Sequence, residues 1–202
     1  MKKNIILIIS LSFFTFVLSY GISYANRIIT KSNLVSNIEE KEDLGDEEAS
    51  YNGESYSDIA SKINKKYAVD SKKCVVTKDD TEEEITIKDL GEYIAKYSIS
   101  KGVDPYLIAA IIMVNSNMST KCNEKVKYCN NVSDLVGGDS RCFGGAYKKY
   151  TKLEDSVKDL VDYVSSEFYA NDLTKPYDIY KSYDKKIDWA FKVDKYMKNL
   201  KK

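Results

Sequence analysis

Histidine is missing from all 202 residues of this chain. Zinc hydrolases that bind their metal through histidine are therefore excluded. Serine and cysteine enzymes that use an imidazole base are excluded for the same reason. Any catalysis by this chain must rely on carboxylate, tyrosine or lysine side chains.

The chain also lacks a net charge, because lysine plus arginine and aspartate plus glutamate both number 31. This balance gives no reason to expect nucleic acid or an anionic surface as a partner. The charges are segregated, however, with seven carboxylates against one lysine in residues 39–48. We interpret this stretch as a solvated linker, and we assign a solvated helix face to the C-terminal lysines Lys192, Lys195, Lys198, Lys201 and Lys202.

Residues 1–25 resemble an export signal. Two lysines precede an apolar stretch at 5–18, and the small-x-small tripeptide Ser-Tyr-Ala follows at 23–25. This pattern predicts a signal peptide that is cleaved after Ala25, or a retained signal anchor, since the weakly polar stretch can just span a bilayer. Both alternatives place the rest of the chain outside the cytoplasm, secreted or at the cell surface. We expect membrane contact only through this segment.

The four cysteines form an even set in a chain that is predicted to be exported, so disulfides are expected. Three pairings are open. Zinc is disfavoured because no Cys-x-x-Cys pair occurs, and nothing else suggests a metal or a cofactor. A bridge within residues 122–142 would close a short loop and contribute about 3 kcal/mol. The cysteines are Cys74, Cys122, Cys129 and Cys142.

The pattern of polar and apolar residues divides the remaining chain into three parts. Residues 26–57 are acidic and predict a flexible spacer. Residues 58–87 mix helical and strand-like spacing and predict a small adaptor of uncertain structure. From residue 88 to the end the periodicity is helical, and an irregular, glycine-containing stretch at 116–150 carries three of the cysteines. A mainly α domain with a disulfide-stapled loop lobe is expected.

Two helix starts are predicted from capping patterns. Asp104 followed by Pro105 is typical of a helix beginning, and Thr151 with Glu154 forms a capping-box pattern. In the first of these helices, Asn115 follows Ile111 by four residues and so extends the apolar stripe. We therefore expect Asn115 to be buried or to line a cleft.

Four segments resemble the glucosaminidase and lysozyme-like peptidoglycan hydrolases, of the mannosyl-glycoprotein endo-beta-N-acetylglucosaminidase type. The family's helix that ends in a catalytic glutamate is similar to GVDPYLIAAIIMVNSNMST. Its asparagine-asparagine-x-glycine-glycine turn resembles Cys129-Asn-Asn-Val with the glycines at 137–138. Its aromatic strand and amphipathic helix resemble FGGAY and LEDSVKDLVDYV, and its closing tryptophan helix resembles DWAFKV. The resemblance covers about 91–199 and implies a lysozyme-like fold.

The resemblance assigns roles to particular positions. Asn115 stands where the family has its proton-donating glutamate, and Ser116 with its successors replaces the glycines that normally follow. Tyr150 takes the position of the tyrosine that holds the sugar and stabilises charge, with Tyr147 as the second candidate. The implied substrate-binding residues are Ser116, Asn131, Gly144, Gly145 and Tyr147.

Because an amide cannot act as a general acid, three functions are open. The first is an exported domain that binds peptidoglycan, or an envelope protein partner, with weak or no hydrolysis, and in which Asn115 hydrogen-bonds to the sugar. The second is an active N-acetylglucosaminidase or muramidase that uses another carboxylate, for which the candidates are Glu124, Asp134 and Asp139. The third is a non-catalytic envelope interaction module.

Overall fold

The computed structural model describes residues 49–71, 74–78, 81–85, 87, 89–117, 123–138, 141–143 and 146–202. The described residues belong to the second of the two units into which the chain divides, Glu48–Lys202. The predicted signal segment and most of the predicted spacer lie outside the described residues. None of the described helices has the length and apolar character needed to cross a membrane.

The second unit is mainly helical, as predicted, with three short antiparallel hairpins among the described residues. The hairpins are β1 (Ser50–Tyr51) with β2 (Glu54–Ser55), β3 (Cys74–Lys78) with β4 (Thr81–Ile85), and β5 (Arg141–Cys142) with β6 (Tyr147–Lys148). The helices are α2 (Tyr56–Asp70), α3 (Gly91–Ser100), α4 (Pro105–Ser116), α5 (Glu124–Cys129), α6 (Leu153–Glu167), the 3₁₀ turn η1 (Tyr169–Asn171), α7 (Pro176–Tyr183) and α8 (Ile187–Leu200).

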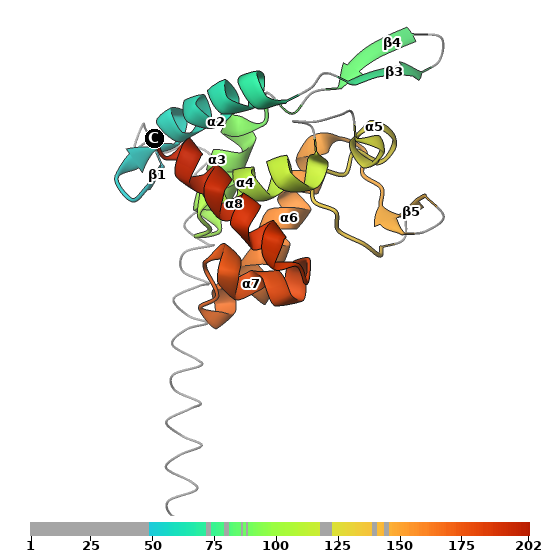
Figure 1. Cartoon of the computed structure of the whole chain (residues 1–202). Helices are drawn as coiled ribbons and strands as arrows, with labels where there is room; N and C mark the ends of the chain where they lie inside the picture. The colour runs from blue at the N-terminus through green and yellow to red at the C-terminus, as the bar shows by residue number, and fades with distance from the viewer. Residues whose placement is uncertain are drawn as a thin grey trace, which may run out of the picture. The chain divides into compact units, whose positions relative to one another are not determined.

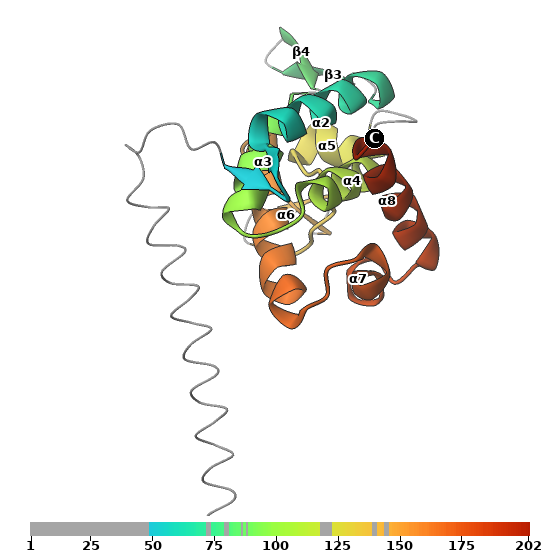
Figure 2. The same cartoon turned by 90° about the vertical axis from the view of Figure 1, so that its left-hand side faces the viewer.

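Helix α4 lies at the centre of this unit, packed against α2, α3, α6 and α8 (Figures 1 and 2). It begins as predicted: the Asp104 carboxylate accepts a hydrogen bond from the Tyr106 backbone N–H at 2.9 Å, and Pro105 occupies the first helical position. Nearly all its residues are buried, which agrees with a helix that is apolar on every side.

Helix α2, in the first part of the predicted adaptor at 58–87, belongs to the same core. Ile59, Ile63 and Tyr67 are buried in the cluster that contains the α4 side chains. The Tyr67 hydroxyl donates to the Ala109 carbonyl of α4 at 2.6 Å. The predicted spacer is too long, because residues 50–57 form the β1–β2 hairpin and the start of α2.

The predicted capping box at Thr151 is wrong. Helix α6 begins at Leu153, one residue later than that pattern predicts, with Lys152 at its N-cap and no side-chain cap. The Asn130 side-chain amide donates to the carbonyls of Tyr150 and Thr151 at 3.1 and 2.9 Å, which ties this stretch to the end of α5. The buried face of α6 is formed by Ser156, Val157, Leu160, Val161 and Val164.

A disulfide joins Cys129, at the end of α5, to Cys142 of β5, with their Cα atoms 5.9 Å apart. A bridge within residues 122–142 is thereby confirmed, and it closes a loop with a sequence separation of 13 residues. In the chain-entropy account such a loop contributes about 3 kcal/mol. Cys122 lies outside the described residues, and of Cys74 only its place in β3 is described.

Buried tyrosines predict that the fold is sensitive to alkaline pH. Burial raises the pKa of Tyr67 and of Tyr183 well above the usual tyrosine value. The unfolded chain therefore loses these protons first, so the free energy of unfolding should fall above about pH 10, by about 1.4 kcal/mol per pH unit for each residue. Urea unfolding measured at a series of pH values checks this. Tyr67→Phe should reduce the slope of the free energy of unfolding against pH by the contribution of one tyrosine. A free energy of unfolding that does not change above about pH 10 would contradict the prediction.

Candidate functional site

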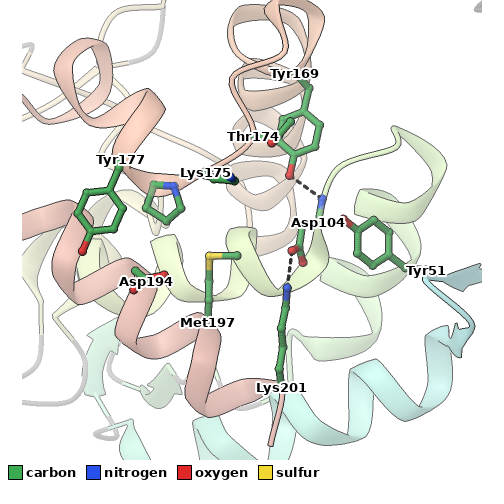
Figure 3. A pocket seen from close by; sticks show the side chains of 10 residues that line it. Tyr51, Asp104, Tyr169, Thr174, Lys175, Tyr177, Asp194, Met197 and Lys201 are labelled. Atoms are coloured by element: carbon green, nitrogen blue, oxygen red, sulfur yellow. Dashed lines mark hydrogen bonds and ion pairs between the residues drawn. The ribbon is translucent and has the colours of Figure 1, made fainter.

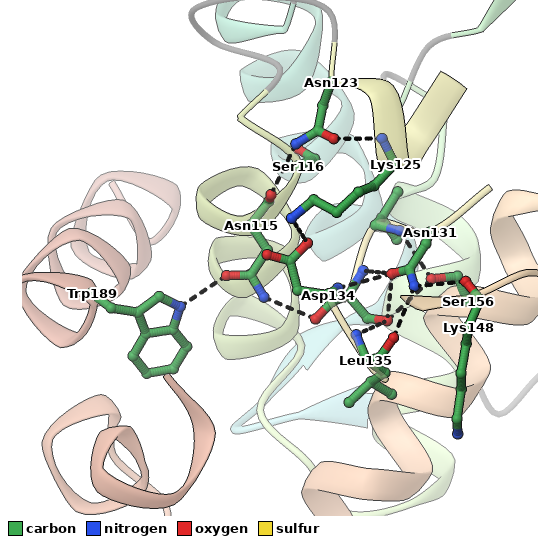
Figure 4. A network of polar contacts seen from close by, with 12 residues as sticks. Asn115, Ser116, Asn123, Lys125, Asn131, Asp134, Leu135, Lys148, Ser156 and Trp189 are labelled. Carbon is green, nitrogen blue, oxygen red and sulfur yellow. Dashed lines mark hydrogen bonds and ion pairs between the residues drawn. The ribbon is translucent and has the colours of Figure 1, made fainter. Parts of the chain in front are cut away.

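Asn115 lies in the last turn of α4, with 7% of its surface exposed, so its predicted burial is confirmed. Its side-chain N–H groups donate to the Ser133 carbonyl and to the Tyr183 hydroxyl, both at 3.0 Å. Its side-chain carbonyl accepts from the Trp189 indole N–H at 2.9 Å (Figure 4). An indole can only donate, so it fixes which end of the amide faces α8. Both amide hydrogens and the carbonyl oxygen are therefore used inside the protein.

The partners of Asn115 also contact one another. The Tyr183 hydroxyl donates to the Ser133 carbonyl at 2.6 Å. The Tyr183 ring stacks on the Trp189 indole, with centroids 4.9 Å apart and planes 23° from parallel. Burial raises the pKa of Tyr183, so its hydroxyl stays a neutral donor. One amide thus links α4, the end of α7, the start of α8 and the loop at 131–135.

Asn131 holds that loop in place. Its side-chain oxygen accepts from the backbone N–H of Ser133 at 3.1 Å and of Asp134 at 2.9 Å. Its amide hydrogens go to the carbonyls of Leu135 at 3.1 Å and Lys148 at 2.9 Å. Asn131 is fully buried, so the structure gives it a positioning role in place of the sugar contact that the resemblance implies.

The other predicted substrate-binding residues lie in different environments. Ser116 is fully buried, and its hydroxyl faces the Met113 carbonyl at 3.5 Å. Tyr147 is half-buried in β6, with the Lys125 ammonium 4.8 Å from its ring centroid. Gly144 and Gly145 lie outside the described residues. Of these positions, Tyr147 is the one that the structure describes as accessible.

Tyr150 and Asn115 contact the same residue, Ser133. Its hydroxyl donates to the Asp159 carboxylate at 2.6 Å, and the Lys148 ammonium contacts the same carboxylate oxygen at 2.7 Å. Burial and Asp159 together raise the pKa of Tyr150, and a hydrogen bond with the Ser133 side chain opposes them. A neutral phenol of this kind can donate a hydrogen bond but cannot serve as a base near neutral pH.

Asp134 directly follows Ser133, whose carbonyl accepts a hydrogen bond from Asn115. It adopts a left-handed backbone with φ of 62° and pairs with the Lys125 ammonium (Figure 4). Burial raises the pKa of Asp134, Lys125 lowers it, and Asp184 raises it further. A carboxyl group with a raised pKa is a suitable general acid. Glu124 is exposed in the first turn of α5, and Asp139 lies outside the described residues.

A pocket of about 450 Å³ opens at the opposite end of α4, beside Asp104 (Figure 3). The Lys201 ammonium pairs with the Asp104 carboxylate at 2.8 Å, and the Asp104 backbone N–H donates to the Tyr169 hydroxyl at 3.1 Å. None of the described site residues that we predicted lines this pocket. Its lining is Tyr51, Asp104, Tyr169, Thr174, Lys175, Pro176, Tyr177, Asp194, Met197 and Lys201.

Sequence reasoning missed Ser133 and Tyr183, which complete the surroundings of Asn115. Ser133 accepts the hydrogen bonds of Asn115 and Tyr183 through its backbone carbonyl. Every residue has this group, so the residue type gives no signal. Tyr183 is one of 17 tyrosines and lies 68 positions from Asn115. Trp189 belongs to the segment that resembles the closing helix of the family. A buried indole N–H needs a hydrogen-bond acceptor, and this need is the one signal in the sequence for its contact with Asn115.

The chain matches no model of a known protein family and no curated protein. The assignment to a hydrolase family therefore stays a prediction from the four motifs. Among the described residues, no group of three or more acidic or cysteine side chains is arranged to hold a metal ion.

Removing the Asn115 amide should destabilise the fold. Asn115→Ala leaves the Trp189 indole N–H and the Ser133 carbonyl with fewer partners in a buried site, which should cost about 3 kcal/mol. Chemical unfolding followed by circular dichroism measures the change. Asn199→Ala, at an exposed position of α8, is the control and should stay within about 0.5 kcal/mol. Equal stabilities for the two variants would show that the amide is not needed for folding.

Proposed function

We propose that this chain is an exported, lysozyme-like domain that binds peptidoglycan glycan strands and does not cleave them through residue 115. The proposal joins the predicted export signal and the four motifs to the geometry around Asn115. The amide at position 115 cannot perform the proton transfer that a glutamate would perform. General acid catalysis of this kind typically raises the rate about 10²- to 10⁴-fold.

The observation that carries the proposal is the internal use of the Asn115 amide. With 7% of the residue exposed and three hydrogen bonds to the protein, the side chain has no free N–H for a sugar hydroxyl. The direct sugar contact that we expected from Asn115 is therefore not available in this conformation. Glycan contacts must come from side chains farther from the helix end.

The disulfide-stapled lobe supplies exposed aromatic side chains that suit a sugar ring. Tyr128 and Phe143 are 52% and 45% exposed, and their rings meet edge to face with centroids 6.2 Å apart. Aromatic rings offer a large, stiff contact area at low entropic cost. Tyr147 and Lys125 belong to the same lobe and add a half-buried ring and a cation. We assign the glycan-binding surface to these residues.

Cleavage assays with the full chain test the loss of catalysis. The natural chain should sediment with purified peptidoglycan and release no new reducing ends. Asn115→Glu should bind and gain measurable cleavage, whereas Asn115→Gln, which has the same length without an acid, should not cleave. Circular dichroism must show that both variants fold. Release of reducing ends by the natural chain would contradict the proposal.

The second candidate function is a working glycoside hydrolase with Asp134 as its acid. The raised pKa of Asp134 and its position next to Ser133 favour this candidate. If the natural chain cleaves, Asp134→Asn should abolish cleavage with little change in binding. The matched control is Glu124→Gln, at the exposed carboxylate of α5 that we also considered.

The aromatic surface makes a separate prediction about affinity. Tyr128→Ala combined with Phe143→Ala should weaken binding to peptidoglycan by about 30-fold, because each exposed ring contributes on the order of 1 kcal/mol. Phe191→Ala, at an exposed aromatic of α8, should leave binding unchanged. Affinities come from sedimentation with a series of peptidoglycan concentrations. A loss of equal size in both variants would move the binding surface away from the lobe.

A further inference from the structure

Helix α8 exposes large apolar side chains beside lysines. Ile187, Phe191, Lys195 and Lys198 follow one another at spacings of four, four and three residues, so they lie on one side of the helix. Phe191 is 66% exposed and Ile187 is 52% exposed. The opposite side holds Trp189, Ala190, Val193 and Leu200, all buried in the core.

A third exposed apolar group adjoins this stripe. Tyr177 of α7 is 41% exposed and lies near Asp194 of α8 at the rim of the pocket (Figure 3). Helices α7 and α8 pack against each other, which brings Tyr177 beside the part of α8 that carries Asp194. We call the side chains of Tyr177, Ile187, Phe191, Lys192 and Lys195 the α8 patch.

The α8 patch lies in the positively charged part of a neutral chain. Residues 173–202 hold nine lysines against four aspartates, a net charge of +5, whereas the whole chain has a net charge of zero. Lys192 and Lys195 are exposed and follow Phe191 by one and four residues along α8. Neither lysine forms an ion pair within the part of the chain that the structure describes. Their charges are therefore available to an external anionic surface.

We propose that the α8 patch binds the surface of a membrane that contains anionic phospholipid. Helices that lie in the membrane interface insert apolar side chains such as phenylalanine and hold lysines near the headgroups, and exposed Phe191 and Ile187 with neighbouring lysines offer the same two kinds of group. Lysines within a few ångströms of an anionic bilayer are attracted to it, and the apolar side chains enter the boundary between headgroups and acyl chains. The charge complementarity with net +5 and the exposed apolar groups together favour lipid over a soluble acidic partner.

This inference revises the expectation that only residues 1–25 contact the membrane, and it does not depend on glycan binding. Helix α8 keeps its buried side in the core, so it would lie along the bilayer surface and not cross it. Three apolar side chains with two lysines provide weak, reversible binding. Such binding would orient the domain relative to the bilayer.

The test places a tryptophan in the patch of the full chain. Phe191→Trp is mixed with vesicles of phosphatidylcholine and phosphatidylglycerol, some of whose acyl chains carry bromine as a quencher. Fluorescence from residue 191 should be quenched by the brominated lipid, and less so in vesicles of phosphatidylcholine alone. The natural chain, with Trp189 as its one tryptophan, gives the background, since that indole is buried.

Two controls distinguish membrane binding through the α8 patch from binding through the N-terminal segment and from nonspecific electrostatic attraction. Val69→Trp reports from an exposed apolar position of α2, where Val69 is 77% exposed, and should not be quenched. Adding Lys192→Gln and Lys195→Gln to Phe191→Trp should raise the vesicle concentration for half-maximal quenching about 30-fold. The same change at the exposed lysines Lys65 and Lys149 should have little effect.

Two results would overturn the proposal. Equal quenching at residues 69 and 191 would mean that the chain meets the bilayer through another segment. A shift in residue 191 emission with soluble polyglutamate, without quenching by brominated lipid, would assign the patch to an acidic protein partner. Because all these positions are exposed, thermal unfolding should show the variants to be as stable as the natural chain.

Discussion

The hydrogen bonds of the Asn115 amide are the interaction on which the arrangement of α4, α7 and α8 depends. Helix α4 ends in the middle of the core, where a polar side chain must find partners or lose the free energy of its hydration. Asn115 finds them in Ser133, Tyr183 and Trp189, at 3.0, 3.0 and 2.9 Å. These partners come from the loop at 131–135 and from helices α7 and α8.

A glutamate would fit these contacts only with its carboxyl group protonated. One amide N–H of Asn115 points at the Ser133 carbonyl, and a carboxylate there would face another acceptor. A buried carboxylate would also need protonation or a cation to offset its desolvation. The position therefore holds a neutral side chain that matches one indole donor and two oxygen atoms. The neutral amide therefore stabilises the fold through its hydrogen bonds, and it has no acidic proton to donate in catalysis.

The fold could be anticipated where local chemistry determines it. Asp104 and Pro105 fix the start of α4, and the periodicity after them correctly buries Asn115. Local patterns failed at Thr151, because the Asn130 side chain binds the carbonyls of Tyr150 and Thr151 and the helix starts beyond them. They also failed to assign α2 to the core, since the stripe of Ile59, Ile63 and Tyr67 does not say which helix it faces. The partners of Asn115 lie 18, 68 and 74 positions away, and no local pattern encodes contacts over such distances.

The central claim is that the Asn115 amide stabilises the fold through direct contacts with α7 and α8. A double-mutant cycle with Asn115→Ala and Tyr183→Phe measures one of these contacts, because the cycle cancels what each change does alone. The account predicts a coupling free energy of at least about 1 kcal/mol in chemical unfolding. Additive effects of the two substitutions, with a coupling near zero, would contradict it.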